Sequence, residues 1–513
     1  LILRAYAVYS NQSHHGEPKL KLSFVKLYDK LLSKTSMILI ILFVATILRF
    51  ISINQSLWLD EAINVNNAAG LSFKELIFNY SLGDFHPPLY HVLLRSWILF
   101  FGSSEISVRI PSIILSIVGV YFIYLIAKKL FENKTALVAA TLVATAPLHI
   151  YYSQEARMYM LASTLAAASV YFFIALIKND KLKYWIGFII ATSLMLYSDY
   201  LPYLLIPTFV IYLFFNRKRI PKSALRAFIP AFILIFILLT PWLVIFPSQL
   251  STGLSAAAAS PAWAQVVGTP DFKNLVLVFV KFTVGRISHD NNLIYALSFA
   301  PVAAFSIFLL LLSLFRSSYL RSFIYYWLFP PVILGFLIAF FVPIFSYFRF
   351  LFVLPAYYLI WASAINTVNW APLTRILLGA ALVINLGATT IYISNPKFQR
   401  EDWKSATAYL KESADSRTVV LFESNLTFGP FDYYNIGDLQ AIGALADFSA
   451  TPPKVREDLN LYISDKNKIY LFQYLSQITD PGGLVFEKLT KLGFKNTATR
   501  DFIGVGFIYE FKK

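Results

Sequence analysis

Long apolar runs, separated by short polar segments, fill most of the chain up to residue 394. A helix needs about 20 apolar residues to cross about 30 Å of hydrocarbon, so these runs predict membrane-spanning helices. The candidate runs lie at residues 36–53, 87–102, 110–131, 135–150, 159–177, 184–196, 201–215, 224–246, 293–315, 323–342, 348–364 and 373–393. Several are shorter than a full crossing. We expect an all-α polytopic membrane protein with about 11–13 transmembrane helices.

A different pattern begins at Asn395, where apolar and polar residues mix as in a soluble domain. The spacing predicts helices at 402–413 and 486–492, and strands at 418–422, 468–474 and 503–511. Helices and strands mixed in this way predict a small soluble α/β domain. The chain is therefore expected to comprise an N-terminal segment (1–35), a transmembrane domain (36–394) and a C-terminal α/β domain (395–513).

Composition strengthens the membrane prediction. Hydrophobic residues make up 58% of the chain, which is more than a soluble protein of average composition contains. The chain has no cysteine, which excludes disulfides and thiolate metal sites. The net charge of +16 comes entirely from the part before Asn395, because basic and acidic residues balance after it. A basic surplus in a lipid-bound region indicates cytoplasmic loops and anionic head groups or phosphates, not nucleic acid.

The distribution of Lys and Arg predicts the orientation. Residues 1–35 are basic, which places the N-terminus in the cytoplasm. If every run crossed, the basic segment 216–222 would lie outside and the C-terminal domain inside, against the same rule. Omitting one early crossing, most simply the run 87–102 with its His91 and Arg95, makes the basic loops cytoplasmic and the C-terminal domain extracytoplasmic. We therefore favour an odd number of crossings, near eleven, in the cell membrane.

With this topology, several polar segments share the outer face. They are the loop 54–86, the residues Glu105 and Arg109, and the segment 153–157. The loop 247–292 also lies outside, and it is too long for a bare connection. Its aromatic and basic residues suggest that it covers a site; examples are Trp263, Lys281 and Arg286.

The loop 54–86 is predicted to form two short interfacial helices. Gly70 can end the first helix, and the segment 72–75 has the capping-box spacing that starts the second, with Gly83 after it. Asp60 falls near the N-terminus of the first helix, where the helix dipole favours a negative charge. The loop thus gathers charged groups at a membrane boundary, where they are costly unless they have a function.

Three acids and a histidine in this loop are the candidate catalytic groups: Asp60, Glu61, Asp84 and His86. Sugar transfer from a phosphate-linked donor needs a carboxylate base for the acceptor and polar groups for the departing phosphate. Asp60 or Glu61 suits the base. Asp84 suits a second acid that orients substrate or, with Asp60, chelates a divalent cation, and His86 suits a phosphate or metal contact. The alternative is that Asp60 only caps its helix and His86 only precedes a proline turn.

Arginines at the ends of other apolar runs are candidates for phosphate binding, because a guanidinium recognises phosphate bidentately. They are Arg109, Arg157 and Arg349, and Glu155 beside Arg157 completes the predicted substrate-binding set. For Arg109 and Arg157 the alternative is an ion pair with Glu105 or Glu155 that joins helices. For Arg349 the alternative is an interfacial arginine that snorkels. Asp199, between two runs, is interpreted as structural.

These motifs, in this order, resemble the GT-C superfamily of membrane glycosyltransferases, and most closely its branch of protein O-mannosyltransferases and aminoarabinose-transferase-like enzymes. The acidic pair Asp60-Glu61 is similar to that family's pair in the first outer loop. The segment 84–89 is similar to its mannosyltransferase motif, and Arg109 to the arginine that follows. The similarity extends to the segment 153–159, to Arg349 with Pro355 and to Arg400-Glu401-Asp402-Trp403.

The resemblance implies a donor that is a polyprenyl-phosphate sugar, and transfer of mannose or another hexose with inversion to a protein, lipid or glycan acceptor. It thereby implies a role in glycosylation at the cell envelope. Two departures stand out: the aminoarabinose branch has lysine where His86 stands, and no sugar-binding repeat domain is visible. The main alternative function is a transporter or lipid flippase, although no repeated halves appear. A third is a non-catalytic assembly protein with an outer binding domain.

Overall fold

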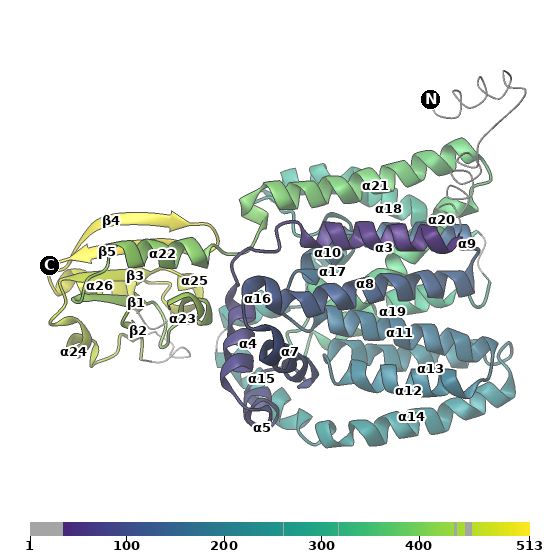
Figure 1. The fold of residues 1–513 in the computed structure, drawn as a ribbon, viewed down its shortest axis with the longest axis horizontal. Helices are drawn as coiled ribbons and strands as arrows, with labels where there is room; N and C mark the ends of the chain where they lie inside the picture. The colour runs from purple at the N-terminus through teal and green to yellow at the C-terminus, as the bar shows by residue number, and fades with distance from the viewer. Residues whose placement is uncertain (1–33, 260, 316–317, 436–438, 447–453) are drawn as a thin grey trace, which may run out of the picture.

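A computed structural model describes residues 34–259, 261–315, 318–435, 439–446 and 454–513. It consists of an elongated helical bundle and a smaller α/β domain beside one end of the bundle (Figure 1). We call that end the domain end. The predicted N-terminal segment 1–35 falls almost entirely outside the described residues. The fold class predicted from the sequence, a helical membrane protein with a small C-terminal α/β domain, is confirmed.

The bundle is built from long apolar helices. Among the described residues, six helices are long and apolar enough to cross a membrane, and the bent pair α9 and α10, which meet at 59°, makes up to seven. Five further apolar helices are shorter. The bundle helices are α3 (Lys34–Phe50), α8 (Glu105–Leu130), α9 (Asn133–Ala144), α10 (Pro147–Ser153), α11 (Tyr159–Lys178), α12 (Leu182–Leu196), α13 (Leu205–Asn216), α14 (Lys222–Leu243), α17 (Phe272–Val284), α18 (Asn292–Leu314), α19 (Phe323–Ile338), α20 (Leu354–Thr367) and α21 (Ala371–Ser394).

Short helices at the domain end carry most of the candidate site (Figure 1). They are α4 (Leu59–Gly70), α5 (Phe73–Glu75), α6 (Ser81–Gly83), α7 (Leu89–Phe101), α15 (Phe246–Ala259) and α16 (Pro261–Gly268). The predicted capping box is present: Ser72 and Glu75 each accept a hydrogen bond from the other's backbone N–H. The expected helix after Gly70 therefore begins where the sequence places it.

Helix α7 does not run the length of the bundle. Its 13 residues span about 20 Å, which is short of a membrane core of about 30 Å. At its start, Leu89 N–H donates to the Tyr197 carbonyl, and just after its end the Ser103 carbonyl accepts from Tyr433 of the C-terminal domain. From its middle, Arg95 donates to the Ala68 carbonyl of α4. That the run 87–102 fails to cross stays a prediction, which the short length of α7 supports.

The described residues of the C-terminal domain include a mixed sheet of five strands in the order β2-β1-β3-β5-β4. β1 pairs in parallel with β2 and β3, whereas β5 is antiparallel to β3 and β4. The strands are β1 (Thr418–Phe422), β2 (Ala441–Gly443), β3 (Lys468–Phe472), β4 (Lys495–Phe502) and β5 (Gly506–Lys512), and the helices are α22 (Trp403–Ser413), α23 (Gly429–Asn435), α24 (Leu459–Ile463), α25 (Ser476–Thr479) and α26 (Leu484–Lys491).

The strands predicted at 418–422, 468–474 and 503–511 correspond to β1, β3 and β5. These strands were recognisable because β1 and β3 are buried almost throughout and read as continuous apolar runs. β4 was not predicted, because it is an edge strand with mainly exposed side chains and no apolar alternation.

Candidate functional site

Helix α4 carries the two adjacent acids, Asp60 and Glu61, but places them in different surroundings. Successive residues of an α-helix point about 100° apart, so the two carboxylates cannot face the same way. The Glu61 side chain is fully buried, whereas about a third of the Asp60 side chain is exposed: 0% against 36%. Of the two, only Asp60 is open to a substrate.

Glu61 and Arg109 form a buried bidentate ion pair. Arg109 Nε donates to Glu61 Oε1 over 2.9 Å and Nη2 to Oε2 over 2.7 Å, and the Ala156 N–H adds a third bond to Oε1 at 2.8 Å. Burial by itself would raise the pKa of Glu61, but the charge and hydrogen bonds of Arg109 outweigh it and lower that pKa. The Glu61 carboxylate is therefore ionised, and both of its oxygens accept hydrogen bonds from within the protein.

The remaining donors of Arg109 are also used. Its guanidinium donates to the carbonyls of Ile53, Gln55 and Ser56 over 2.6 to 2.9 Å. Together with the two bonds to Glu61, these account for all five N–H groups of an arginine. Arg109 therefore fixes the chain that leads into α4 and keeps no donor for a phosphate. Glu105, which the sequence offered as an ion-pair partner of Arg109, pairs instead with Lys404 of the C-terminal domain at 3.2 Å.

Asp60 lies against Arg157, with Oδ2 3.4 Å from Nη2. Arg157 is buried, and its Nε has no hydrogen-bond partner among the described residues. The Arg157 guanidinium lies 5.9 Å from the centroid of the Tyr159 ring, and Tyr159 packs against Phe348, the residue before Arg349, with ring centroids 5.5 Å apart. The structure thus pairs a partly exposed carboxylate with Arg157 and places the segment of Arg349 next to them.

Asp84 is held by two histidines. Its Oδ2 lies 2.9 Å from His91 Nε2 and 3.4 Å from His86 Nδ1. Burial would raise the pKa of Asp84, but the charges and hydrogen bonds of His86 and His91 hold it well below its ordinary value. Asp84 therefore stays ionised, and His86 faces it from a buried position. His91 was not predicted as a site residue, because nothing in its own segment links it to Asp84.

Gln249 of α15 holds the loop that carries Asp84 through hydrogen bonds. Its Nε2 donates to the carbonyls of Ser81 and Asp84, the latter over 2.8 Å, and its Oε1 accepts from the Tyr200 hydroxyl. Gln249 is buried, so these bonds are not shared with bulk water. This residue lies about 165 positions from the loop it holds, and sequence reasoning missed it.

We expect Gln249→Leu to loosen the loop 81–86. The substitution conserves size but leaves two buried carbonyls without their donor, at a cost of about 1–3 kcal/mol. Hydrogen exchange in peptides covering residues 76–91 should become faster than in the wild type. Thr252→Ala, one turn further along the exposed face of α15, is the matched control and should leave this exchange unchanged. Equal exchange in Gln249→Leu and the wild type would contradict this role.

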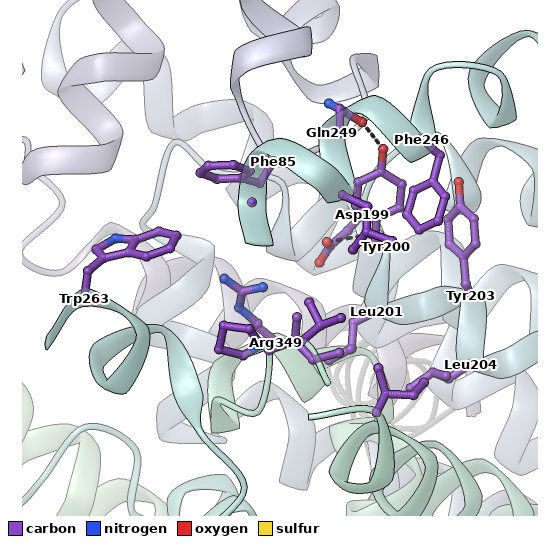
Figure 2. Close-up of a pocket in the computed structure, with 16 residues that line it drawn as sticks. Phe85, Asp199, Tyr200, Leu201, Tyr203, Leu204, Phe246, Gln249, Trp263 and Arg349 are labelled. Atoms are coloured by element: carbon purple, nitrogen blue, oxygen red, sulfur yellow. Dashed lines mark hydrogen bonds between the residues drawn. The ribbon is translucent and has the colours of Figure 1, made fainter. Parts of the chain in front are cut away.

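A cavity of about 370 Å³ adjoins this loop. Figure 2 shows Arg349, Phe85 and Trp263 around it, with Asp199 on the wall next to Tyr200. The lining is mainly aliphatic and aromatic, and Phe85 and Trp263 pack with ring centroids 5.8 Å apart. The Nε of Arg349 is buried without a hydrogen-bond partner among the described residues. The cavity combines an apolar wall with a guanidinium, and Trp263 of α16, within the predicted outer loop 247–292, is one of its lining residues.

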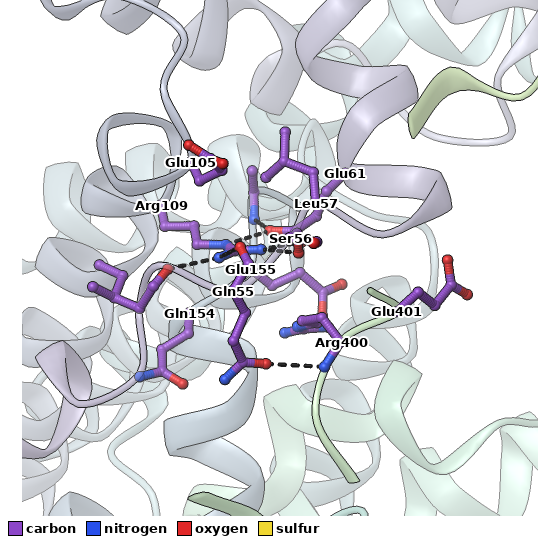
Figure 3. A network of polar contacts seen from close by, with 12 residues as sticks. Gln55, Ser56, Leu57, Glu61, Glu105, Arg109, Gln154, Glu155, Arg400 and Glu401 are labelled. Atoms are coloured by element: carbon purple, nitrogen blue, oxygen red, sulfur yellow. Dashed lines mark hydrogen bonds and ion pairs between the residues drawn. The ribbon is translucent and has the colours of Figure 1, made fainter. Parts of the chain in front are cut away.

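Glu155 is buried and pairs with Arg400, not with Arg157. Arg400 Nη1 lies 2.6 Å from Glu155 Oε2, and its guanidinium stacks over the Tyr151 ring with 3.7 Å to the ring centroid. Figure 3 shows this pair beside the Glu61–Arg109 pair. Arg400 stands where the chain enters the C-terminal domain, so this contact joins the two parts of the molecule.

Arg286 is a further basic residue at this end. Its side chain is exposed, and its guanidinium lies over the Tyr151 ring at 5.0 Å. The sequence placed it in the loop thought to cover a site but gave it no role.

In the part of the chain that the structure describes, no three His, Asp or Glu side chains are grouped so that they could hold a metal ion. Asp60 pairs with Arg157 and Asp84 with two histidines, so each acid of the predicted cation site already has a protein partner. The geometry gives the candidate divalent-cation site at Asp60 and Asp84 no support.

Comparison with known proteins adds a sequence family and a set of similar folds. Residues 85–245 match the family model described as dolichyl-phosphate-mannose-protein mannosyltransferase. No curated protein sequence matches the chain. ArnT from Cupriavidus metallidurans in the apo state is 13% identical over 93% of this chain and 98% of that chain, with a TM-score of 0.56.

Two further structures are similar. ArnT bound to undecaprenyl phosphate is 12% identical over 93% of this chain and 98% of its own, with a TM-score of 0.57. The archaeal oligosaccharyltransferase AglB from Archaeoglobus fulgidus, in complex with an inhibitory peptide and a dolichol-phosphate, is 12% identical over 94% of this chain and 74% of its own, with a TM-score of 0.54. At such low identity the likeness concerns the fold.

Proposed function

Since this chain has the GT-C fold of the PMT- and ArnT-like membrane glycosyltransferases, we propose that it transfers a sugar from a polyprenyl-phosphate carrier. The sugar would be mannose or another hexose, and the acceptor a protein, lipid or glycan. Lipid phosphates bound to ArnT and AglB support a donor of this class. We place the N-terminus in the cytoplasm and the domain end outside, as the basic loops require.

The observation that carries this proposal is the position of Asp60. It is the partly exposed carboxylate of α4, and it faces Arg157. Arg157 in turn lies over the Tyr159 ring, which packs against Phe348, next to the Arg349 that lines the apolar cavity. The apolar wall of that cavity suits isoprenyl units, and a guanidinium suits the phosphate. A carboxylate base next to a phosphate site is what sugar transfer requires.

In the proposed reaction, Asp60 accepts the proton of the acceptor's nucleophilic group. That group attacks the anomeric carbon as the bond from this carbon to the phosphate oxygen breaks, so the configuration inverts. The phosphate keeps the electron pair and leaves on its lipid, with its charge balanced by Arg157 and Arg349. Arg286 is a further candidate for this phosphate.

Several predicted site residues receive supporting roles in this proposal. We assign Glu61, Arg109 and Glu155 to holding the site together, because each is buried and engaged within the protein. We assign Asp84 and His86 to shaping the loop that places Phe85 in the cavity wall. The base is therefore Asp60 and not Glu61.

Replacing Arg349 by alanine should weaken use of the donor. A charge-assisted hydrogen bond to phosphate contributes about 1.5–3 kcal/mol, so kcat/KM should fall about 10- to 100-fold. Arg349→Lys should recover part of the loss. Arg217→Ala, an exposed arginine of a basic loop, is the matched control and should keep wild-type kinetics. If Arg349→Ala kept the wild-type kcat/KM, the proposal that the donor phosphate binds in this cavity would be wrong.

Transfer by the purified protein tests the function directly. The protein in nanodiscs is mixed with a radiolabelled polyprenyl-phosphate hexose and an extract of envelope acceptors, and release of the free lipid phosphate is measured together with labelled product. A protein that moves the labelled lipid across a proteoliposome membrane, but never cleaves it, would be a transporter or flippase instead.

A further inference from the structure

The segment between α10 and α11 carries Arg157 outside either helix. α10 ends at Ser153 and α11 begins at Tyr159, so the backbone groups in between need partners from other elements. Ala156, in the middle of this segment, is fully buried. Because Arg157 is the next residue, whatever holds the backbone of Ala156 also determines where the Arg157 side chain starts.

Helix α4 holds Ala156 through both of its backbone polar groups. The Ala156 N–H donates to Glu61 Oε1 over 2.8 Å, and the Ala156 carbonyl accepts from Asn64 Nδ2 over 3.4 Å. Glu61 and Asn64 are three residues apart, a spacing that makes their side chains neighbours on the surface of a helix. Ala156 is thus held by two neighbouring side chains of the helix that carries Asp60.

The orientation of the Asn64 amide follows from its two partners. A carbonyl oxygen only accepts hydrogen bonds, so the group of Asn64 that faces the Ala156 carbonyl is the NH2. The amide oxygen then faces the Tyr80 hydroxyl, which donates to it over 3.1 Å. Asn64 is buried, so these bonds are not shared with bulk water.

Tyr80 extends this network to the loop of Asp84. It ends a short π-helical turn, Leu76–Tyr80, and its ring packs edge-on against His91 with 5.0 Å between the ring centroids. His91 Nε2 in turn lies 2.9 Å from Asp84 Oδ2. Asn64 therefore stands between the segment of Arg157 and the loop of Asp84.

Glu155, the residue before Ala156, is held by elements other than α4. Its carbonyl accepts from Ser112 Oγ of α8 over 2.6 Å, and its carboxylate pairs with Arg400. These contacts anchor one side of the segment to the bundle and to the C-terminal domain. The bonds from α4 add a second anchor, on the side where Arg157 Nη2 lies 3.4 Å from Asp60 Oδ2.

We propose that Asn64 is a positioning residue: together with Glu61 it holds Ala156 against α4 and so fixes Arg157 opposite Asp60. The inference rests on the proposed function, which makes Asp60 the base and Arg157 a partner of the phosphate. The helix that carries the base thereby also sets the position of the cation that balances the charge of the leaving phosphate.

Hydrogen exchange tests the contact without any substrate. In Asn64→Leu, which nearly keeps the size of the side chain, the Ala156 carbonyl loses its donor. Exchange in peptides covering residues 153–160 should become faster by about 2- to 10-fold, the effect of one hydrogen bond. Asn67→Leu is the matched control: Asn67 donates to the Ile63 carbonyl within α4, so exchange of residues 153–160 should equal that of the wild type. Wild-type exchange of this segment in a folded Asn64→Leu variant would overturn the proposal.

Kinetics test the positioning role. Because small misplacements of a reacting group are costly, Asn64→Leu should lower kcat about 10- to 100-fold. The KM for the polyprenyl-phosphate hexose should stay close to that of the wild type, since Asn64 does not line the cavity of Arg349. In an Arg157→Ala background, Asn64→Leu should cause no further loss, because it acts through Arg157. An additional loss in that background would indicate a general structural effect and overturn the proposal.

The two failures can be told apart. A wild-type protein that transfers no sugar contradicts the proposed function, while the exchange experiment still decides the contact between Asn64 and Ala156. A wild-type protein that transfers sugar, together with Asn64→Leu at the wild-type kcat, contradicts only the positioning role.

A smaller change carries the test if Asn64→Leu does not fold. Tyr80→Phe removes the hydroxyl that holds the Asn64 amide, and it should speed exchange of residues 153–160. Its control is Tyr124→Phe, because the Tyr124 hydroxyl also donates to an asparagine, Asn133, over 2.9 Å, between α8 and α9. Equal exchange of the segment in these two variants would overturn the proposal.

Discussion

Asp60→Asn is expected to lower the rate of sugar transfer about 100- to 10,000-fold, which is the range that general-base catalysis contributes. Asparagine keeps the size of the side chain and its contact to Arg157 but cannot accept a proton at neutral pH. Asp60 is partly exposed, and asparagine keeps an oxygen that can accept from the buried Arg157, so losing the charge should cost less than breaking a fully buried ion pair. Folding and the KM for the donor should therefore stay close to those of the wild type, as measured by thermal unfolding in detergent and by initial rates.

The control for Asp60→Asn is Asp290→Asn. Asp290 also lies in a loop predicted to face outward, and its exposed side chain pairs with the exposed Lys397. A surface pair of this kind contributes little to stability, so its loss should leave the rate unchanged. If Asp60→Asn transferred sugar at the wild-type rate, another group would have to be the base, and the proposed mechanism would be wrong.

Arg109→Met is expected to cause a loss of folded protein and not a loss of donor affinity. Removing one partner of a buried ion pair costs about 3–5 kcal/mol, because the other charge is left buried and unpaired. Here the remaining charge is Glu61, and the carbonyls of Ile53, Gln55 and Ser56 lose their donor as well. A lower yield and a lower Tm should be visible in detergent, and Arg109→Lys should not restore them, since an ammonium lacks the fork geometry.

Arg375→Met serves as the control for Arg109→Met, because Arg375 is an exposed arginine of α21. Its Tm should equal that of the wild type. If Arg109→Met were stable but had a raised KM for the donor, Arg109 would be a substrate-binding residue. That result would contradict the structural role that the geometry gives it.

The sequence predicted those features that depend on neighbours along the chain. Lipid offers no hydrogen bonds to the backbone, so a span must be a helix and must be apolar over its whole length, which leaves a visible run of residues. The capping box at Ser72 and Glu75 was equally visible, because both partners lie within one turn. The start of the C-terminal domain showed as a change of composition, and the acids of the loop 54–86 showed as a cluster.

The residue types in the candidate site were also predictable, but their pairing was not. The sequence offered Glu105 and Glu155 as partners for Arg109 and Arg157, yet the structure pairs these arginines with Glu61 and Asp60. Any of these acids would satisfy an arginine chemically. The choice depends on where separate helices place the side chains, which no local pattern records.

The sequence by itself thus determined that this is a helical membrane protein with a small α/β domain and a cluster of acids and arginines at helix ends. Only the tertiary structure decided that Asp60 is open while Glu61 is buried, that Glu61 pairs with Arg109, and that Gln249 holds the loop of Asp84. The reason is physical: burial and pairing depend on distances between groups from separate elements, and those distances are set by the packing of the whole chain.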